Sequence, residues 1–172
     1  MSRIILVTGG ARSGKSRWAE ERIESLIFPW TYIATAEPRD GEMRERINAH
    51  IARRGPNWTT IEEPFDLSGA LTRSDGTGAR LVDCVTFWLT NLMLADHDWQ
   101  AALTALTDTL EAQTSPVILV TNEVGAGIVP DNALARRFRD AAGAANQAIA
   151  AVSAEVVLVS CGLPLILKNV QN

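Results

Sequence analysis

The sequence has few of the residues that are typical of secreted proteins, of proteins stabilised by a structural metal ion, or of nucleic-acid-binding proteins. Its two cysteines, Cys84 and Cys161, are too few for a disulfide framework and are expected to be buried free thiols. The 20 acidic residues outnumber the 16 Lys and Arg, and this balance argues against a general binder of nucleic acid or membrane surfaces. No apolar run approaches membrane-spanning length, and no charged-then-apolar leader precedes the first strand-like run. We therefore expect a cytoplasmic protein that neither binds nucleic acid nor spans a membrane.

What the sequence does contain fits one α/β domain covering residues 1–172. Apolar runs and helical patterns alternate along the chain, and this alternation predicts a mostly parallel sheet with helices on both faces. Strands are expected at 4–7, 31–34, 79–85, 117–121 and 156–160, and helices at 15–26, 41–54, 87–95, 99–112 and 132–151. Short strands could be added at 58–61 and 165–168, and the polar segment 72–78 is expected to be an exposed loop.

The most informative segment is a phosphate-binding pattern near the start of the chain. Residues 8–16 read TGGARSGKS and match G-x-x-x-x-G-K-[ST], with Gly9, Gly14, Lys15 and Ser16 at the fixed positions. An apolar strand precedes the pattern and a helix follows it, as a triphosphate cradle requires. Lys15 would reach the β- and γ-phosphates, and the Ser16 hydroxyl would bind Mg²⁺. The pattern predicts a P-loop NTPase domain.

A P-loop enzyme also needs a carboxylate near the Mg²⁺ ion, usually at the end of an apolar strand. Asp83 follows Arg80-Leu81-Val82, and Glu123 follows Val120-Thr121-Asn122, so both meet this requirement. We favour Asp83 as the metal ligand because an aspartate within an apolar strand needs a partner. Either carboxylate could instead cap a helix or pair with an arginine.

A second informative stretch is the expected helix at 41–54. Met43, Ile47 and Ile51 recur every four residues as an apolar stripe, and Arg46, His50 and Arg54 form a parallel one. His50 would lie between two guanidinium groups, which bind phosphate and would keep its imidazole neutral. Such a histidine suits acceptance of a nucleotidyl group, although helix geometry alone also suits a solvated or packing residue. The other histidine, His97, is expected on the surface.

Taken together, the motifs resemble one family nearly end to end: the bifunctional adenosylcobinamide kinase / adenosylcobinamide-phosphate guanylyltransferase of cobalamin biosynthesis. The P-loop alone is shared by many families, so the histidine helix and the Asn122-Glu123-Val124-Gly125 segment make the match specific. The other segments that carry the resemblance are 32–36, 58 with 62–64, 82–86 with 88–91, 126–130, 136 with 138–140 and 143, and 162–165 with 168.

The resemblance implies a RecA-like fold and two reactions. A nucleoside triphosphate, ATP or GTP, phosphorylates adenosylcobinamide, and GMP is then transferred from GTP to adenosylcobinamide phosphate through a guanylylated histidine, here His50. Mg²⁺ is the implied cofactor, with Ser16 and Asp83 as ligands, and a homo-oligomer such as a trimer is implied. The implied nucleotide-binding residues are Gly9, Gly10, Ala11, Arg12, Ser13, Gly14, Lys15, Ser16, Arg46, Arg54, Glu62 and Asp83. A monofunctional metabolite kinase and a nucleotide-binding regulatory switch are the alternatives.

Overall fold

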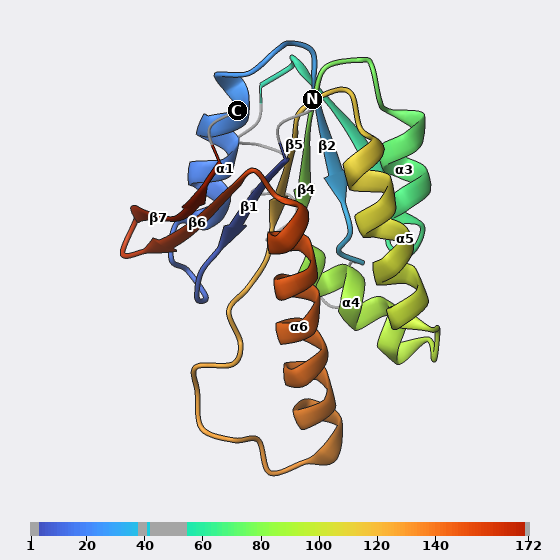
Figure 1. Ribbon diagram of the computed structural model, residues 1–172, viewed down its shortest axis with the longest axis vertical. Helices are drawn as coiled ribbons and strands as arrows, with labels where there is room; N and C mark the ends of the chain where they lie inside the picture. Colours follow the sequence, from blue (N-terminus) through green and yellow to red (C-terminus); the bar gives the residue numbers. More distant parts are fainter. Residues whose placement is uncertain (1–3, 38–40, 42–54, 171–172) are drawn as a thin grey trace.

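The computed structural model describes residues 4–37, 41 and 55–170 and contains one seven-stranded sheet (Figure 1). The strand order is β3-β2-β4-β5-β1-β6-β7; all neighbouring strands are parallel except the antiparallel pair β6–β7. The strands are β1 (Ile4–Thr8), β2 (Trp30–Ala34), β3 (Trp58–Glu62), β4 (Ala79–Asp83), β5 (Val117–Val120), β6 (Glu155–Ser160) and β7 (Leu163–Asn169). The predicted α/β class is confirmed.

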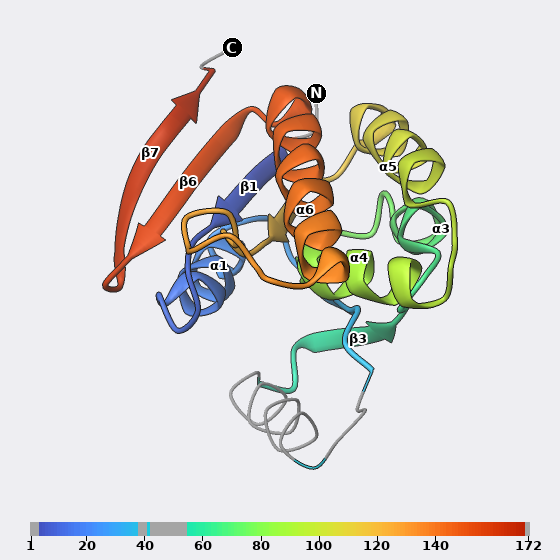
Figure 2. The same cartoon turned by 90° about the horizontal axis from the view of Figure 1, so that it is seen from below.

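Helices cover both faces of the sheet, but unequally within the described ranges. One face packs against α3 (Leu67–Arg73), α4 (Val85–Leu94), α5 (Trp99–Ala112) and α6 (Ala133–Val152). The other face packs against α1 (Lys15–Glu24), which contributes Ala19 and Ile23 to its core. Figure 2 shows α1 and α6 on opposite sides of β1. Within β1, and likewise within β5, successive residues alternate between the two hydrophobic cores, as the two-residue period of a strand requires.

The central strands are buried because helices or neighbouring strands cover them on every side. All residues of β1 and β5 are buried, which agrees with their continuous apolar runs in the sequence. The late strand expected at 165–168 is present as the longer β7, and the strand expected at 58–61 is present as the edge strand β3. Among the described helices, none is long and apolar enough to cross a bilayer.

The expected exposed loop at 72–78 was partly wrong. The segment 72–78 is not simply an exposed loop, because α3 extends to Arg73 and Ser74 is buried. The α3 helix begins where the Asp66 carboxylate accepts a hydrogen bond from the Gly69 N–H at 2.9 Å. Its weak sequence signal follows from Gly69 and the short polar side chains, which lower helix propensity. Burial of Leu67 and Leu71 compensates for that deficit.

The expected burial of both cysteines was wrong for one of them. Cys84 is buried, but Cys161 is exposed. Cys161 and Gly162 form the two-residue turn between β6 and β7, with φ values of 54° and 78°. Positive φ at both positions is the pattern of the tight hairpin turn that matches strand twist. Cys161 therefore lies at a turn rather than inside a strand.

Candidate functional site

The P-loop lies at the carboxyl end of β1, between Thr8 and the start of α1. Glycine is required at two of its positions. A Cβ atom on Gly9 would overlap the Val159 carbonyl oxygen and the Ser13 hydroxyl, and Gly14 has a φ of 94°. Gly14 caps α1 without any side-chain hydrogen bond to the first turn. The amino end of α1 therefore keeps backbone N–H groups for an anion.

Two hydroxyl groups at this loop have hydrogen-bonding capacity to spare. The Lys15 ammonium donates a 3.0 Å hydrogen bond to the Gly10 carbonyl, so it lies over the loop that a phosphate would occupy. Within the described ranges, the buried hydroxyls of Thr8 and Ser13 have no hydrogen-bond partner. Buried hydroxyls without a partner are costly, so an anion or water would satisfy them. The loop fits a phosphate group.

The β6–β7 turn supports the P-loop from the side. The Gly162 N–H donates a 2.8 Å hydrogen bond to the Ser13 carbonyl, and a Cβ on Gly14 would come within 3.1 Å of the Gly162 Cα. This contact joins residues almost 150 positions apart, as their numbers show. Residues 162–165 carry part of the family resemblance, but their sequence indicates no role, because only the folded sheet brings β6 beside β1.

Asp83 lies half-buried at the end of β4, with Cys84 directly after it. Strand β5 separates β4 from β1, so Asp83 faces the P-loop across one strand. Burial, with help from the Asp83 charge, raises the pKa of the Cys84 thiol to about 12, although the Phe87 N–H, the Thr86 hydroxyl and the Lys15 charge oppose this rise. The Cys84 thiol therefore stays protonated at neutral pH.

A hydrogen-bond network holds the strand ends around Asp83 in place. The sequence did not lead us to expect it. The Thr35 hydroxyl donates to the Cys84 carbonyl at 2.7 Å and accepts from the Cys84 N–H at 2.8 Å. The Asn91 amide donates to the carbonyls of Thr35 and Pro64. The Thr86 hydroxyl accepts from the Asn122 N–H at 2.8 Å. The feature of the sequence that could have indicated this network is the set of polar residues that directly follow the apolar strands.

The two glutamates considered for the site lie at different distances from the P-loop. Glu123 follows β5, and its N–H donates a 3.1 Å hydrogen bond to the Gly9 carbonyl. Its exposed carboxylate accepts from the Gly125 N–H at 2.8 Å. Glu62 ends the edge strand β3, four strand spacings from β1 and hence roughly 19 Å away at the usual spacing of parallel strands. Only an extended nucleotide could reach from the P-loop to Glu62.

The nucleophile candidate His50 and its neighbours Arg46 and Arg54 lie outside the described residues. Their predicted roles therefore stay predictions. In the ranges 4–37 and 55–170 no group of three or more His, Cys, Asp or Glu side chains forms a metal cluster. Mg²⁺ at a P-loop does not need such a cluster, because a hydroxyl, a carboxylate, phosphate oxygens and water supply its ligands.

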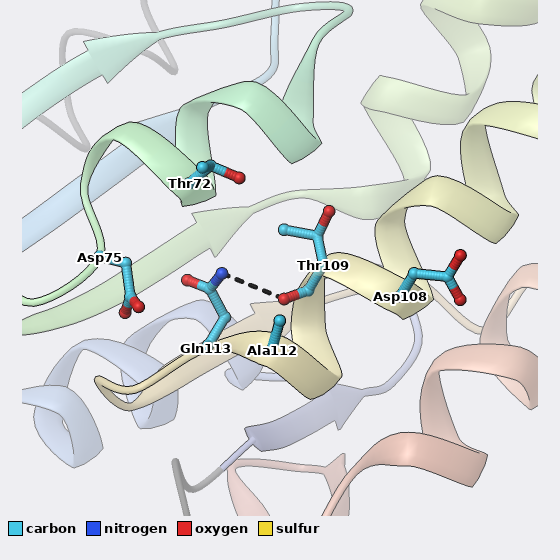
Figure 3. A pocket seen from close by; sticks show the side chains of 6 residues that line it. All are labelled: Thr72, Asp75, Asp108, Thr109, Ala112 and Gln113. Carbon is cyan, nitrogen blue, oxygen red and sulfur yellow. Dashed lines mark hydrogen bonds between the residues drawn. The ribbon is translucent and has the colours of Figure 1, made fainter.

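A separate pocket of about 380 Å³ lies at the opposite, amino-terminal edge of the sheet, between α3 and α5 (Figure 3). It is lined by Thr72, Asp75, Asp108, Thr109, Ala112 and Gln113. Beside it, the fully buried Arg80 guanidinium contacts the Asp75 carboxylate at 2.9 Å, and it also donates to the Gln113 side chain and the Ser115 carbonyl. These contacts link β4 to the loop before β5, so this cluster has a structural role.

Asp75→Asn is expected to reduce the free energy of unfolding by about 2–4 kcal/mol at pH 7, because it leaves the buried Arg80 charge without a counter-charge. Burial alone would raise the pKa of Asp75, but hydrogen bonds from the Ser115 and Thr114 N–H groups, the Thr114 hydroxyl and Arg80 outweigh burial and lower it. The stabilisation is therefore present above the unfolded pKa of about 3.9 and is lost as the pH falls through the folded value.

Urea unfolding of wild type and variant at pH 7 and near pH 3 measures this effect. The difference should shrink at the lower pH. Glu21→Gln is the control, since the Glu21–Arg17 pair at 2.8 Å is exposed on both sides and should contribute nothing measurable. An Asp75→Asn protein as stable as wild type at pH 7 would exclude the stabilising role of the pair.

Three comparisons with known proteins bear on this site. A family model described as cobinamide kinase / cobinamide phosphate guanyltransferase matches residues 5–167. The bifunctional adenosylcobalamin biosynthesis protein CobP of Pseudomonas aeruginosa is 46% identical over 168 residues, covering 95% of this chain and 96% of that protein. The protein of that description named CobU in Salmonella typhimurium is 43% identical over 181 residues, covering 96% of this chain and 99% of that protein.

A solved structure supports the fold alone. The P4 protein from bacteriophage phi6, in complex with ADP, superposes with a TM-score of 0.52 at 19% identity. The match covers 95% of this chain and 54% of that one, so this chain spans about half the length of the phage protein. At this identity the likeness concerns the arrangement of strands and helices, and it agrees with the P-loop domain described above.

Proposed function

We propose a two-step reaction for this chain, which belongs to the cobinamide kinase / cobinamide phosphate guanyltransferase family. Membership follows from the match over residues 5–167 and from relatives above 40% identity over nearly their full length. The chain is a bifunctional kinase and guanylyltransferase of cobalamin biosynthesis. The observation that carries the detailed proposal is the phosphate cradle at the amino end of α1, with Lys15 lying over it.

In the first step, the hydroxyl of the aminopropanol arm of adenosylcobinamide attacks the γ-phosphorus of ATP or GTP. The bond between that phosphorus and the bridging oxygen breaks, the nucleoside diphosphate leaves with the electron pair, and the hydroxyl proton is released. Backbone N–H groups of Gly14, Lys15 and Ser16 and the Lys15 ammonium would hold the triphosphate in place. Positioning and charge neutralisation supply most of the rate enhancement in such a site.

In the second step, a neutral imidazole nitrogen of His50 attacks the α-phosphorus of GTP, and pyrophosphate leaves. A phosphate oxygen of adenosylcobinamide phosphate then attacks the guanylyl phosphorus, the phosphorus–nitrogen bond breaks, and adenosylcobinamide-GDP forms with free His50. Arg46 and Arg54 are proposed to stabilise the charge that develops on the α-phosphate oxygens. This step rests on the sequence pattern, since these three residues lie outside the described ranges.

Mg²⁺ is the proposed cofactor, and when bound it would neutralise charge on the β- and γ-phosphates. The Ser16 hydroxyl and the Asp83 carboxylate are the proposed protein ligands, and both are the oxygen donors that Mg²⁺ prefers. The fit is supported by the place of Asp83 at the carboxyl end of β4, one strand away from the P-loop strand β1. Glu123 is the alternative carboxylate, but it is exposed and bonded to the Gly125 N–H.

Asp83→Asn is expected to raise the Mg²⁺ concentration for half-maximal phosphorylation about 10- to 100-fold, as weakened metal sites commonly show. The carboxylate charge is lost while the side-chain volume is kept. Glu123→Gln is the matched comparison and should leave the Mg²⁺ dependence unchanged. If Glu123→Gln shows the shift and Asp83→Asn does not, the metal role belongs to Glu123.

Incubation with α-labelled and, separately, γ-labelled GTP tests the two steps together, with and without adenosylcobinamide. The γ-label should appear on the corrinoid, and the α-label should appear first on the protein and then on the corrinoid. A monofunctional kinase would transfer the γ-label only. A regulatory switch would hydrolyse GTP slowly, without any dependence on the corrinoid. Either of these two patterns would overturn the proposed two-step reaction.

A homo-oligomer, such as a trimer, is also proposed. Its support is the row of exposed apolar side chains on the edge strand β7, namely Leu163, Leu165, Ile166 and Leu167. Sedimentation equilibrium of the purified protein measures the assembly, and a monomer across the micromolar range would exclude it. The cytoplasmic location predicted from the sequence stays a prediction.

A further inference from the structure

The segment between β5 and α6, which begins at the P-loop, exposes an unusual number of apolar side chains. We call residues 123–132 the apolar loop. Val124, Ile128 and Val129 within it are 37%, 98% and 63% exposed, and Leu134 at the start of α6 is 47% exposed. Single exposed apolar residues are ordinary, but several within one short segment mark a binding surface. Figure 1 shows this loop running from the end of β5 to the start of α6, alongside the lower half of that helix.

The apolar loop is held in place at both ends. At its start, the Glu123 N–H donates to the Gly9 carbonyl of the P-loop, and the Asn146 amide of α6 donates to the Asn122 carbonyl at 3.3 Å. At its end, the Arg136 guanidinium donates to the carbonyls of Pro130 and Asp131 at 2.9 and 2.7 Å. The start of the apolar loop is therefore tied to the P-loop and to α6, and its end is tied to α6.

An open pocket of about 540 Å³ lies between the apolar loop and α6. It is lined by Gly125, Arg139, Asp140, Gly143, Ala144 and Gln147. The α6 residues recur at intervals of three and four, so they share one face of that helix. Gly143 and Ala144 leave the middle of this face open, while Arg139 and Gln147 border it with polar groups.

The polar groups of the pocket favour a neutral ligand rather than a phosphate. The Arg139 guanidinium donates two hydrogen bonds, at 3.0 and 2.9 Å, to the Asp140 carboxylate. This pair cancels the charge that would attract a nucleotide anion, yet it leaves further donors and acceptors for uncharged groups. The Gln147 amide adds one donor group and one acceptor. Primary amides are the neutral groups that satisfy donors and acceptors together.

We propose that this pocket and the apolar loop form the corrinoid subsite, which binds the rim of the cobinamide ring. The inference rests on the proposed function, because it takes cobinamide as the substrate. The rim of a corrin carries neutral amide side chains and methyl groups. The pocket receives an amide-bearing edge at Arg139, Asp140 and Gln147, and Ile128 and Val129 cover methyl groups. The hydrogen bond from the Glu123 N–H to the Gly9 carbonyl joins the start of the loop to the P-loop, and the aminopropanol arm would extend from the bound rim toward the γ-phosphate.

Two variants with matched controls test the subsite. Ile128→Ser and Arg139→Gln are each expected to raise the KM for adenosylcobinamide and its dissociation constant at least about tenfold, because each removes a contact with the bound rim. The KM for GTP and the binding of GTP in the absence of corrinoid should stay at the wild-type value. The matched controls are Ile27→Ser and Arg137→Gln. Ile27 is an exposed isoleucine just before β2, at the amino-terminal edge of the sheet, and Arg137 is an exposed arginine of α6 outside the pocket lining.

Equilibrium dialysis of adenosylcobinamide, read by its visible absorbance, gives corrinoid binding directly, and unchanged GTP binding shows that each variant is folded. Wild-type corrinoid affinity in both variants would overturn the subsite while leaving the two-step function intact. A rise in the KM for GTP equal to that for corrinoid, or a lower sedimentation mass for Ile128→Ser, would also overturn it, by assigning the loop to the nucleotide or to a subunit contact. Absence of corrinoid binding and phosphorylation by the wild-type protein would instead refute the proposed function.

Discussion

His50→Ala is expected to abolish guanylyl transfer while leaving the kinase step close to wild type. Removal of a covalent nucleophile typically costs on the order of 10⁴-fold or more in rate, because no other group can form the intermediate. The P-loop groups, which hold the triphosphate for the kinase step, are untouched. The variant should therefore accumulate adenosylcobinamide phosphate and form no adenosylcobinamide-GDP. Product analysis by chromatography after reaction with GTP measures both outcomes.

The covalent intermediate provides a second measurement for the same variant. Wild-type protein given α-labelled GTP should hold label that survives alkali and is lost in acid, as a phosphorus–nitrogen bond requires. His97→Ala is the control, since His97 is the chain's other histidine and is exposed, with its ring against Phe65 at a centroid distance of 5.3 Å. It should label like wild type. Label retained by His50→Ala, or guanylyl transfer at a comparable rate, would rule out the nucleophile role.

Lys15→Ala is expected to reduce phosphorylation of adenosylcobinamide by about 10²- to 10³-fold, the usual cost of removing one charge-stabilising donor from a reaction centre. The folded state should be retained. The Lys15 ammonium contacts the carbonyl of Gly10, which is exposed and can bond to water instead. The stability loss should therefore stay near or below about 1 kcal/mol, the net contribution of one hydrogen bond.

Lys168→Ala is the matched control because Lys168 is the only other lysine of the chain. Its ammonium donates to the carbonyls of Ala150 and Ala151 near the end of α6, at the edge of the sheet opposite the P-loop. This variant loses lysine hydrogen bonds to backbone carbonyls, as Lys15→Ala does, but no phosphate contact, so its kinase rate should match wild type. Near-wild-type phosphorylation by Lys15→Ala, or an equal loss in both variants, would contradict the role of Lys15.

Local sequence patterns were sufficient for most of the described strands and helices, because these depend on neighbours in the chain. Gly9 and Gly14 lie where the backbone must turn without a Cβ atom, and the apolar runs of β1 and β5 are buried on both faces as expected. Sequence patterns failed to predict an element where the local residues had only a weak preference for its backbone conformation. The α3 helix is stabilised by burial of Leu67 and Leu71 rather than by propensity, and Cys161 lies at a turn set by its pairing strands.

The sequence by itself determined the α/β class, the P-loop with Lys15 and Ser16, and the family resemblance, since each rests on residues at fixed spacing. Only the tertiary structure decided which strands are neighbours. It placed β5 between Asp83 and the P-loop strand, set Glu62 on the far edge strand, and brought the Gly162 N–H to the Ser13 carbonyl. The reason is physical: periodicity records which face of an element is buried, but strand order depends on packing between segments far apart in the chain.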